Sequence, residues 1–189
     1  MQAFYALIDR LERCNQEEKK AHEDMLWATF GLDACVLALD MSGFSRTVHA
    51  TGIVSYLARI RRMQQLSSPI VVAHGGEVVK YTADNLMAVF LDAAKALQAS
   101  AAIRQACLSL PEPLEVSIGL DTGRFLYVPH TDCFGDPVNV AFKLAEDIAA
   151  NDEILASSGV FLAAGLKAPL TGWSKSEISG LDIAYAALQ

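Results

Sequence analysis

The chain has 189 residues, of which 52% are hydrophobic and 20% are charged, and its formal net charge at pH 7 is −7. These values are typical of one globular domain with a substantial core and a short extension. The acidic balance argues against a nucleic-acid partner, because surfaces that bind a phosphate backbone are usually basic.

No apolar run approaches the roughly 18–20 residues that a helix needs to cross a bilayer, so we expect no membrane span. The first residues show neither a basic leader nor the apolar core of a signal peptide. The four cysteines are scattered and form no CxxC pair, which favours reduced thiols over a zinc site. Together these features predict a cytoplasmic protein.

Residues 1–30 are predicted to form a helical extension, and residues 31–189 a separate domain. Phe4, Leu7, Ile8 and Leu11 recur at helical spacing, and the predicted helix runs from about residue 3 to residue 28. Two interpretations remain open for this helix. It either packs on the domain or serves as a dimerisation or signal-coupling element for an upstream regulator.

The domain begins with an apolar run at residues 34–39, the pattern of a buried strand, which ends at Asp40. A turn over residues 41–43 leads into a helix that opens at Phe44 and is interrupted near residues 49–52. The expected buried face of this helix consists of Val54, Leu57, Ile60 and Met63.

The remaining elements alternate between hairpins and helices. The predicted strands span residues 77–82, 85–91, 114–120, 123–128, 152–156 and 178–188, and the predicted helices span residues 92–109, 137–150 and 159–164. Hairpins alternating with helices predict an α+β fold, in which a mostly antiparallel sheet carries helices on one face.

Asp40 and Asp84 are the candidate metal ligands. Asp40 follows the first strand and Asp84 lies in a tight hairpin, so the two carboxylates converge if the strands are neighbours. Oxygen ligands of this kind suit Mg²⁺ or Mn²⁺ with a phosphorylated ligand. Two structural alternatives remain open: Asp40 could cap the following helix, and Asp84 could be ordinary hairpin-turn chemistry.

The turn that precedes the first helix of the domain is a candidate phosphate site. Backbone N–H groups at a helix start can bind phosphate oxygens. The residues concerned are Met41, Ser42, Gly43 and Phe44.

Three segments in this order resemble the class III adenylate/guanylate cyclase catalytic domain of the bacterial type. LALDMSGFS is similar to the family's first strand and loop, HGGEVVKYTADNLMAVF to its hairpin, and DCFGDPVNVAFKLAED to its third motif. LEVSIGLDTG and NDEILAS resemble the flanking strands, so the similarity extends over residues 34–188. The resemblance implies a ferredoxin-like cyclase fold.

The resemblance also implies an activity and a set of site residues. ATP would be converted to 3′,5′-cyclic AMP and pyrophosphate, with two Mg²⁺ or Mn²⁺ ions per site held by Asp40 and Asp84. Asn139 matches the asparagine that orients the ribose, and Lys143 lies where the family usually has the arginine that stabilises the transition state. The expected assembly is a head-to-tail homodimer, in which the two aspartates of one subunit face the other residues of its partner.

Lys80 and Asp132 match the family's adenine-reading pair. Lysine can donate to adenine N1 and aspartate can accept from the N6 amino group, whereas guanine inverts this pattern. ATP is therefore favoured over GTP. Cys133 is adjacent to Asp132, and a shift of one residue would point to guanine instead.

Three departures from the family pattern leave the activity open. Ala83 replaces the usual glycine, Lys143 replaces arginine, and residues 125–131 lack the arginine that binds the terminal phosphates, for which Arg124 or His130 could substitute. The alternatives to an active cyclase are a catalytically weak or silent nucleotide-binding regulatory domain and a structural dimerisation module.

Overall fold

The computed structural model describes residues 1–43, 48–50, 52–166 and 172–188. The helices are α1 (Gln2–Arg13), α2 (Gln16–Phe30), α4 (Ile53–Ala73), α5 (Ala93–Leu108), α6 (Asp136–Lys143), the π-helical turn η1 (Leu144–Ile148) and α7 (Ser158–Ala163). The strands are β1 (Gly31–Met41), β2 (Glu77–Thr82), β3 (Asn85–Phe90), β4 (Val116–Val128), β5 (Asp132–Phe134), β6 (Ile154–Ser157), β7 (Ser174–Ile178) and β8 (Leu181–Ala187). In the part of the chain so described, no helix is long and apolar enough to span a membrane.

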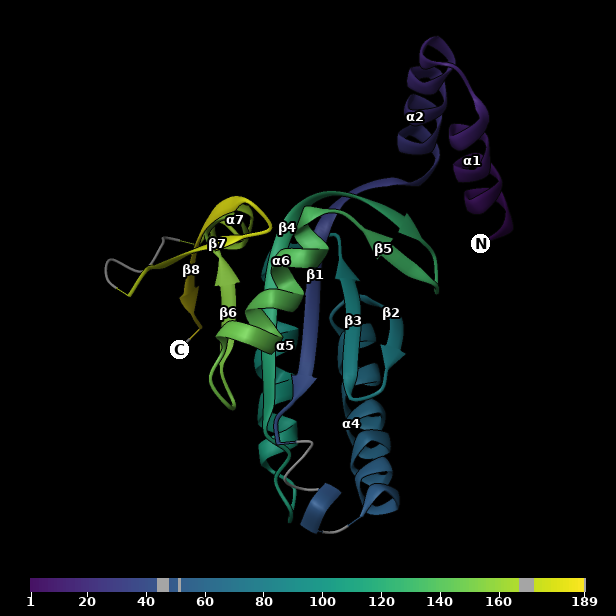
Figure 1. The fold of residues 1–189 in the computed structure, drawn as a ribbon. Helices are drawn as coiled ribbons and strands as arrows, with labels where there is room; N and C mark the ends of the chain where they lie inside the picture. Colours follow the sequence, from purple (N-terminus) through teal and green to yellow (C-terminus); the bar gives the residue numbers. More distant parts are fainter. Residues whose placement is uncertain (44–47, 51, 167–171, 189) are drawn as a thin grey trace.

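One eight-stranded sheet organises the domain, with the order β2-β3-β1-β4-β6-β8-β7 and with β5 paired to β4 (Figure 1). Only the β4–β6 pair is parallel among the pairings described. The α+β fold with a mostly antiparallel sheet is therefore confirmed. The middle of the central strand β1, residues 34–39, is a continuous buried apolar run, because helices cover both of its faces.

The prediction that all helices lie on one face is wrong. Leu37, Leu39 and Ile118 pack into one core with α4, α5 and α7. Val36 and Ala38 point the other way and pack with Ala141 of α6. Figure 1 shows α6 on one side of β1 and β4, with α4 and α5 on the other.

Glycine permits the close approach of α6 to the sheet. A Cβ added to Gly119 of β4 would collide with the carbonyl oxygen of Ala141. The sheet therefore carries a helix layer on each side, and the end of α6 is brought against the middle of the sheet.

The predicted hairpin between residues 114–120 and 123–128 is wrong, since β4 is one strand. It pairs with the whole length of β1, from Gly31 opposite Leu126 to Met41 opposite Val116. Asp121 and Thr122, the turn-like residues in the middle of β4, form side-chain hydrogen bonds within the strand conformation. Thr122 Oγ1 donates to the carbonyl oxygen of Ala34 at 3.1 Å, and the Asp121 carboxylate accepts from the Ser157 hydroxyl.

The predicted strand over residues 178–188 corresponds to β8, and the sequence analysis missed β7, with which β8 forms a hairpin. Ser179 and Gly180 both have positive φ, 55° and 80°, which is the geometry of a two-residue primed turn. This turn joins β7 and β8.

The extension is two helices rather than one. Asn15 interrupts the predicted helix by capping α2: its side chain accepts from the amides of Glu17 and Glu18, while Glu18 accepts from the Asn15 amide. Figure 1 shows α1 and α2 side by side at the start of β1.

The buried face of α4 also differs from the prediction. Val54 is 77% exposed and Leu57 is 53% exposed, whereas Tyr56, Ile60 and Met63 are buried. Of the four residues predicted for the buried face, only Ile60 and Met63 are buried. Tyr56 is buried in place of its neighbour Leu57.

Candidate active site

Asp40 and Asp84 converge at one end of the sheet. Asp40 is the penultimate residue of β1, and Asp84 lies in the two-residue turn between β2 and β3. The β1–β3 pairing places Leu39 opposite Leu86, which brings this turn beside the end of β1. Within the described residues, neither carboxylate is part of an ion pair.

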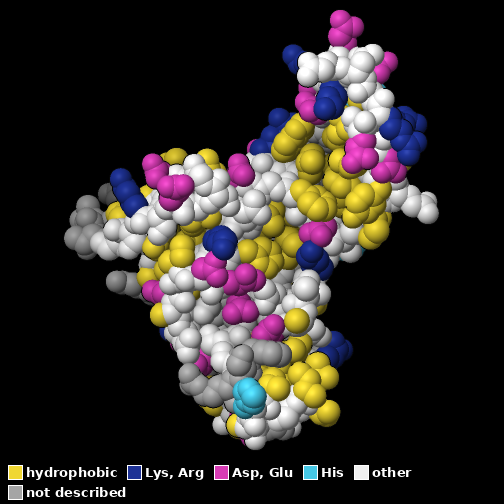
Figure 2. Space-filling view, viewed as in Figure 1, with side chains coloured by type: hydrophobic (Ala, Val, Ile, Leu, Met, Phe, Trp, Pro, Cys, Tyr) yellow, Lys and Arg dark blue, Asp and Glu magenta, His cyan; other side chains and the backbone are white. Residues whose placement is uncertain are grey.

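The two carboxylates repel each other. Burial raises the pKa of Asp40 to about 6, and the charges of Asp84 and Glu146 add to the effect, whereas the Met41 amide partly offsets it. Figure 2 shows acidic side chains gathered where η1 and the β2–β3 turn meet. This corner of the molecule is negatively charged and suits a cation.

The β2–β3 turn is conformationally strained. Ala83 has a φ of 51°, a left-handed conformation that costs an alanine about 1–2 kcal/mol. Asn85 Nδ2 donates to a carboxylate oxygen of Glu146 in η1, which ties the turn to the opposite helix layer. Alanine at the family's glycine position is therefore strained.

The predicted phosphate turn is partly used within the chain. The Met41 amide faces the Asp40 carboxylate, and the Ser42 amide donates to the carbonyl oxygen of Glu115 at 3.0 Å. Gly43 is exposed with a φ of 82°. Phe44 lies outside the described residues. In this conformation the amides of Met41 and Ser42 are therefore engaged within the chain.

Lys80 and Asp132, which the family resemblance pairs, lie side by side. Lys80 Nζ lies 2.7 Å from Asp132 Oδ2. A β-bulge between Val78 and Lys80 interrupts the alternation of β2 and takes Lys80 away from the α4 face of the sheet. Cys133 points into the core beneath α6 and is 4% exposed, so the residue that faces Lys80 is Asp132.

Asn139 and Lys143 lie one turn apart on the exposed face of α6. Lys143 Nζ is 2.5 Å from Asp147 Oδ2, and this hydrogen bond and charge raise the pKa of the lysine. No hydrogen bond or ion pair of the described residues joins Asn139 or Lys143 to Asp40 or Asp84.

Neither substitute for the missing arginine is available in this conformation. The Arg124 guanidinium lies over the Trp27 ring, 4.9 Å from its centroid. His130 Nδ1 lies 3.1 Å from Glu77 Oε1.

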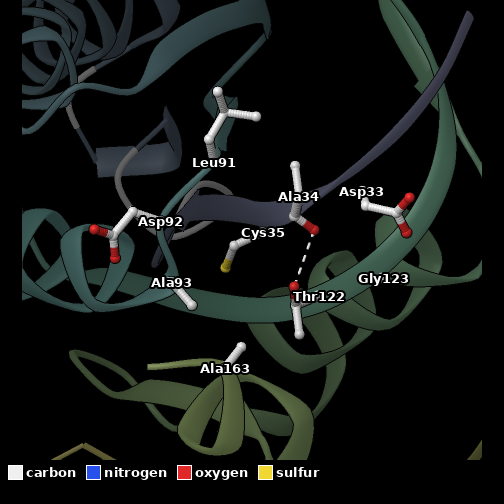
Figure 3. A pocket seen from close by; sticks show the side chains of 9 residues that line it. All are labelled: Asp33, Ala34, Cys35, Leu91, Asp92, Ala93, Thr122, Gly123 and Ala163. Carbon is white, nitrogen blue, oxygen red and sulfur yellow. Dashed lines mark hydrogen bonds between the residues drawn. The ribbon is translucent and has the colours of Figure 1, made fainter. Parts of the chain in front are cut away.

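A cavity of about 520 Å³ lies at the opposite end of the sheet, beside the start of α5 (Figure 3). Cys35, Thr122 and Ala163 line it, with Asp33 and Asp92 on opposite sides. It contains none of the predicted site residues. Asp92 caps α5 by accepting from the amides of Ala94 and Lys95.

No protein-family model matches the chain. Over 133 residues it is 31% identical to the putative adenylate cyclase 3 of Rhizobium meliloti, which covers 67% of this chain and 22% of that relative. The adenylate/guanylate cyclase/hydrolase of Silicibacter pomeroyi superposes with a TM-score of 0.71 and 28% identity, over 82% of this chain and 95% of that structure. The chain contains a class III adenylate/guanylate cyclase domain.

A second solved structure is similar to the chain in its fold. The guanylate cyclase domain from Catenaria anguillulae in complex with GTP matches the cyclase domain with a TM-score of 0.73 and 17% identity, over 83% of this chain and 96% of that chain. The predicted cyclase fold is therefore confirmed.

The donor set of the cyclase domain fits a hard divalent cation. Asp40 and Asp84 supply oxygen ligands only, and no group of three or more His, Cys, Asp or Glu in the described residues is arranged to hold a metal. Mg²⁺ and Mn²⁺ are commonly bound by one or two carboxylates, with substrate phosphates and water completing the shell.

Two residues of this corner were missed by the sequence analysis. Tyr56 Oη donates to Asp84 Oδ2 at 3.0 Å, and Glu146 contacts Asn85. The hydrophobic pattern of the sequence does not distinguish Tyr56 from its neighbours. The pattern around Glu146 is that of an exposed helix end.

Proposed function

We propose that this domain is an adenylate cyclase, which converts ATP to 3′,5′-cyclic AMP and pyrophosphate. The observation that carries the proposal is the convergence of Asp40 and Asp84, two carboxylates that form no ion pair within the described part of the chain. A structural dimerisation module is disfavoured, because it would have no reason to keep this repulsion.

Asp40 and Asp84 would hold two Mg²⁺ or Mn²⁺ ions. When bound, such ions lower the pKa of the ribose 3′-hydroxyl and neutralise charge on the phosphates. The chain's own contribution is to fix both carboxylates at the end of β1 and in the adjacent turn, so that the ligand oxygens are in place before substrate arrives.

Lys80 and Asp132 would read the base. Lys80 donates to adenine N1 and Asp132 accepts from the N6 amino group. Their direct ion pair supports this assignment, because it holds one donor and one acceptor side by side. ATP is preferred, since guanine presents a hydrogen-bond donor at N1 and an acceptor at position 6.

Asn139 and Lys143 would act on the nucleotide bound by a partner subunit in a head-to-tail homodimer. Asn139 orients the ribose, and Lys143 faces the charge that develops on the α-phosphate. Their exposure on α6 supports a role across an interface, because both side chains are accessible to a second copy. Lys143 has to leave Asp147 to act.

The terminal phosphates would bind at the turn of Met41, Ser42, Gly43 and Phe44. Gly43 is the best supported of these residues, because it is exposed and lacks a side chain. Binding through the Ser42 amide would require it to leave the carbonyl oxygen of Glu115.

The helices α1 and α2 would couple an upstream regulator to the site. Phe4 of α1 stacks on Phe134 of β5, with ring centroids 5.3 Å apart. Because Phe134 lies two residues from Asp132, a displacement of α1 would be transmitted to the strand that carries the base-reading aspartate.

A catalytically weak, nucleotide-binding regulatory domain is the second candidate. This candidate is favoured because two cationic side chains already have partners within the chain. Lys143 is paired with Asp147, and Arg124 is stacked on Trp27. Lysine also lacks the planar fork of the usual arginine.

Cyclic-nucleotide production by the purified protein tests both candidates. ATP and GTP are offered separately with Mn²⁺, with Asp84→Ala as the inactive variant and Asp33→Ala as the matched control on the same sheet. Cyclic AMP that is lost only in Asp84→Ala supports the cyclase. No product, together with nucleotide binding by calorimetry, supports the regulatory domain.

A further inference from the structure

Tyr56 is a buried tyrosine whose hydroxyl is directed at Asp84. The side chain is 1% exposed in the core beneath α4. Its hydroxyl donates to Asp84 Oδ2 at 3.0 Å, across 28 residues of sequence. A buried phenol needs a hydrogen-bond partner, and here that partner is a predicted metal ligand.

The turn that carries Asp84 is held from both helix layers. Tyr56 reaches it from α4 on one side, and Glu146 of η1 accepts from Asn85 on the other. Ala83 occupies a left-handed conformation in the same turn. A strained turn persists only where its surroundings fix it, and these two contacts do so.

We propose that Tyr56 is a positioning residue for the metal site. Its hydroxyl engages Oδ2 of Asp84 and leaves the lone pairs of Oδ1 available for a cation. It thereby selects one rotamer of a carboxylate that would otherwise rotate in a half-exposed turn. This inference rests on the proposed function, in which Asp84 binds metal. Hydrogen bonds to ligating carboxylates tune metal affinity in this way.

A matched hydroxyl on the same helix-sheet interface provides the control. Tyr81 Oη lies 3.1 Å from Ser67 Oγ and 3.3 Å from the carbonyl oxygen of Gln64, both on α4. Tyr81→Phe therefore removes a hydroxyl that contacts α4 without touching either aspartate. If Tyr56 had a structural role only, Tyr56→Phe and Tyr81→Phe would have the same effect on Mn²⁺ affinity.

The test is a Mn²⁺ titration followed by electron paramagnetic resonance of the free ion, with α,β-methylene ATP present so that no turnover occurs. Tyr56→Phe is expected to weaken Mn²⁺ binding by roughly 10-fold or more. Tyr81→Phe is expected to stay within about twofold of the unmodified protein. Melting temperatures measured in parallel should fall by similar amounts in both variants. Tyr56→Met, which keeps an apolar side chain, replaces Tyr56→Phe if the latter does not fold.

The outcomes separate this inference from the proposed function. Unchanged Mn²⁺ affinity in Tyr56→Phe, with affinity lost in Asp84→Ala, overturns the role of Tyr56 and leaves the proposed function standing. Unchanged affinity in Asp84→Ala overturns both. A selective loss in Tyr56→Phe and in Asp84→Ala supports both.

Discussion

Replacement of Asp40 by Asn should stabilise the protein in the absence of metal. The pKa of Asp40 rises from 3.8 to about 6 on folding, so ionisation at neutral pH opposes the folded state. A rise in pKa of this size corresponds to at most about 3 kcal/mol. Since Asp40 is only half-buried, solvent screening should reduce this to about 1–2 kcal/mol.

The sign of the effect fixes its pH dependence. A carboxyl with a raised folded pKa costs nothing below the unfolded pKa, and its penalty grows as the pH rises from the unfolded pKa to the folded pKa. The advantage of Asp40→Asn should therefore be small near pH 4, should grow up to about pH 6, and should be constant above it.

Thermal unfolding followed by circular dichroism at pH 4 and pH 8, with a chelator present, measures this advantage. For a domain of this size, about 1–2 kcal/mol raises the melting temperature by roughly 2–8 °C at pH 8. Asp33→Asn, at the exposed start of the same strand, should change little at either pH. Equal gains at both pH values, or no gain at pH 8, would refute the assignment of charge repulsion to Asp40.

Three further predictions concern the turn, α6 and the extension. Ala83→Gly should raise the melting temperature by about 2 °C, because the relief of the left-handed strain exceeds the entropic cost of glycine. The control Ala101→Gly, in the helix α5, should lower the melting temperature by a similar amount. Thermal unfolding followed by circular dichroism measures both changes. Lys143→Arg should raise kcat for cyclic AMP formation several-fold with little change in KM, measured by product chromatography, if the side chain acts on the α-phosphate. Trp27→Ala should remove the cation–π contact with Arg124 and weaken the attachment of α2 to the domain by about 0.5–1 kcal/mol. Limited proteolysis between α2 and β1 should therefore become faster.

Much of the fold could be predicted because its signals are local. The apolar run ending at Asp40 and the hairpin around Asp84 are strand patterns bounded by turn residues, and β2 has the predicted bounds. The failure at Asp121 and Thr122 has a non-local cause. Asp-Thr-Gly is turn chemistry, but the length of β1 keeps β4 extended, and distant partners satisfy its polar side chains.

Part of the geometry of the candidate site is implied by the family resemblance. The resemblance pairs Lys80 with Asp132, and the two side chains are in contact, whereas Cys133 is buried. The pairings of Tyr56 with Asp84 and of Glu146 with Asn85 join residues 28 and 61 positions apart. Such contacts depend on how α4 and η1 pack on the sheet, and no periodicity in the sequence encodes them.

The unfavourable features of the fold are concentrated at one corner. Asp40 and Asp84 repel each other, and Ala83 adopts a conformation that glycine would adopt at lower cost. Both are local disadvantages, and a domain kept only for its fold would have no reason to gather them at one corner. Bound cations and nucleotide phosphates would offset the repulsion, so the same corner that destabilises the free protein should make it more stable with Mn²⁺ and nucleotide present.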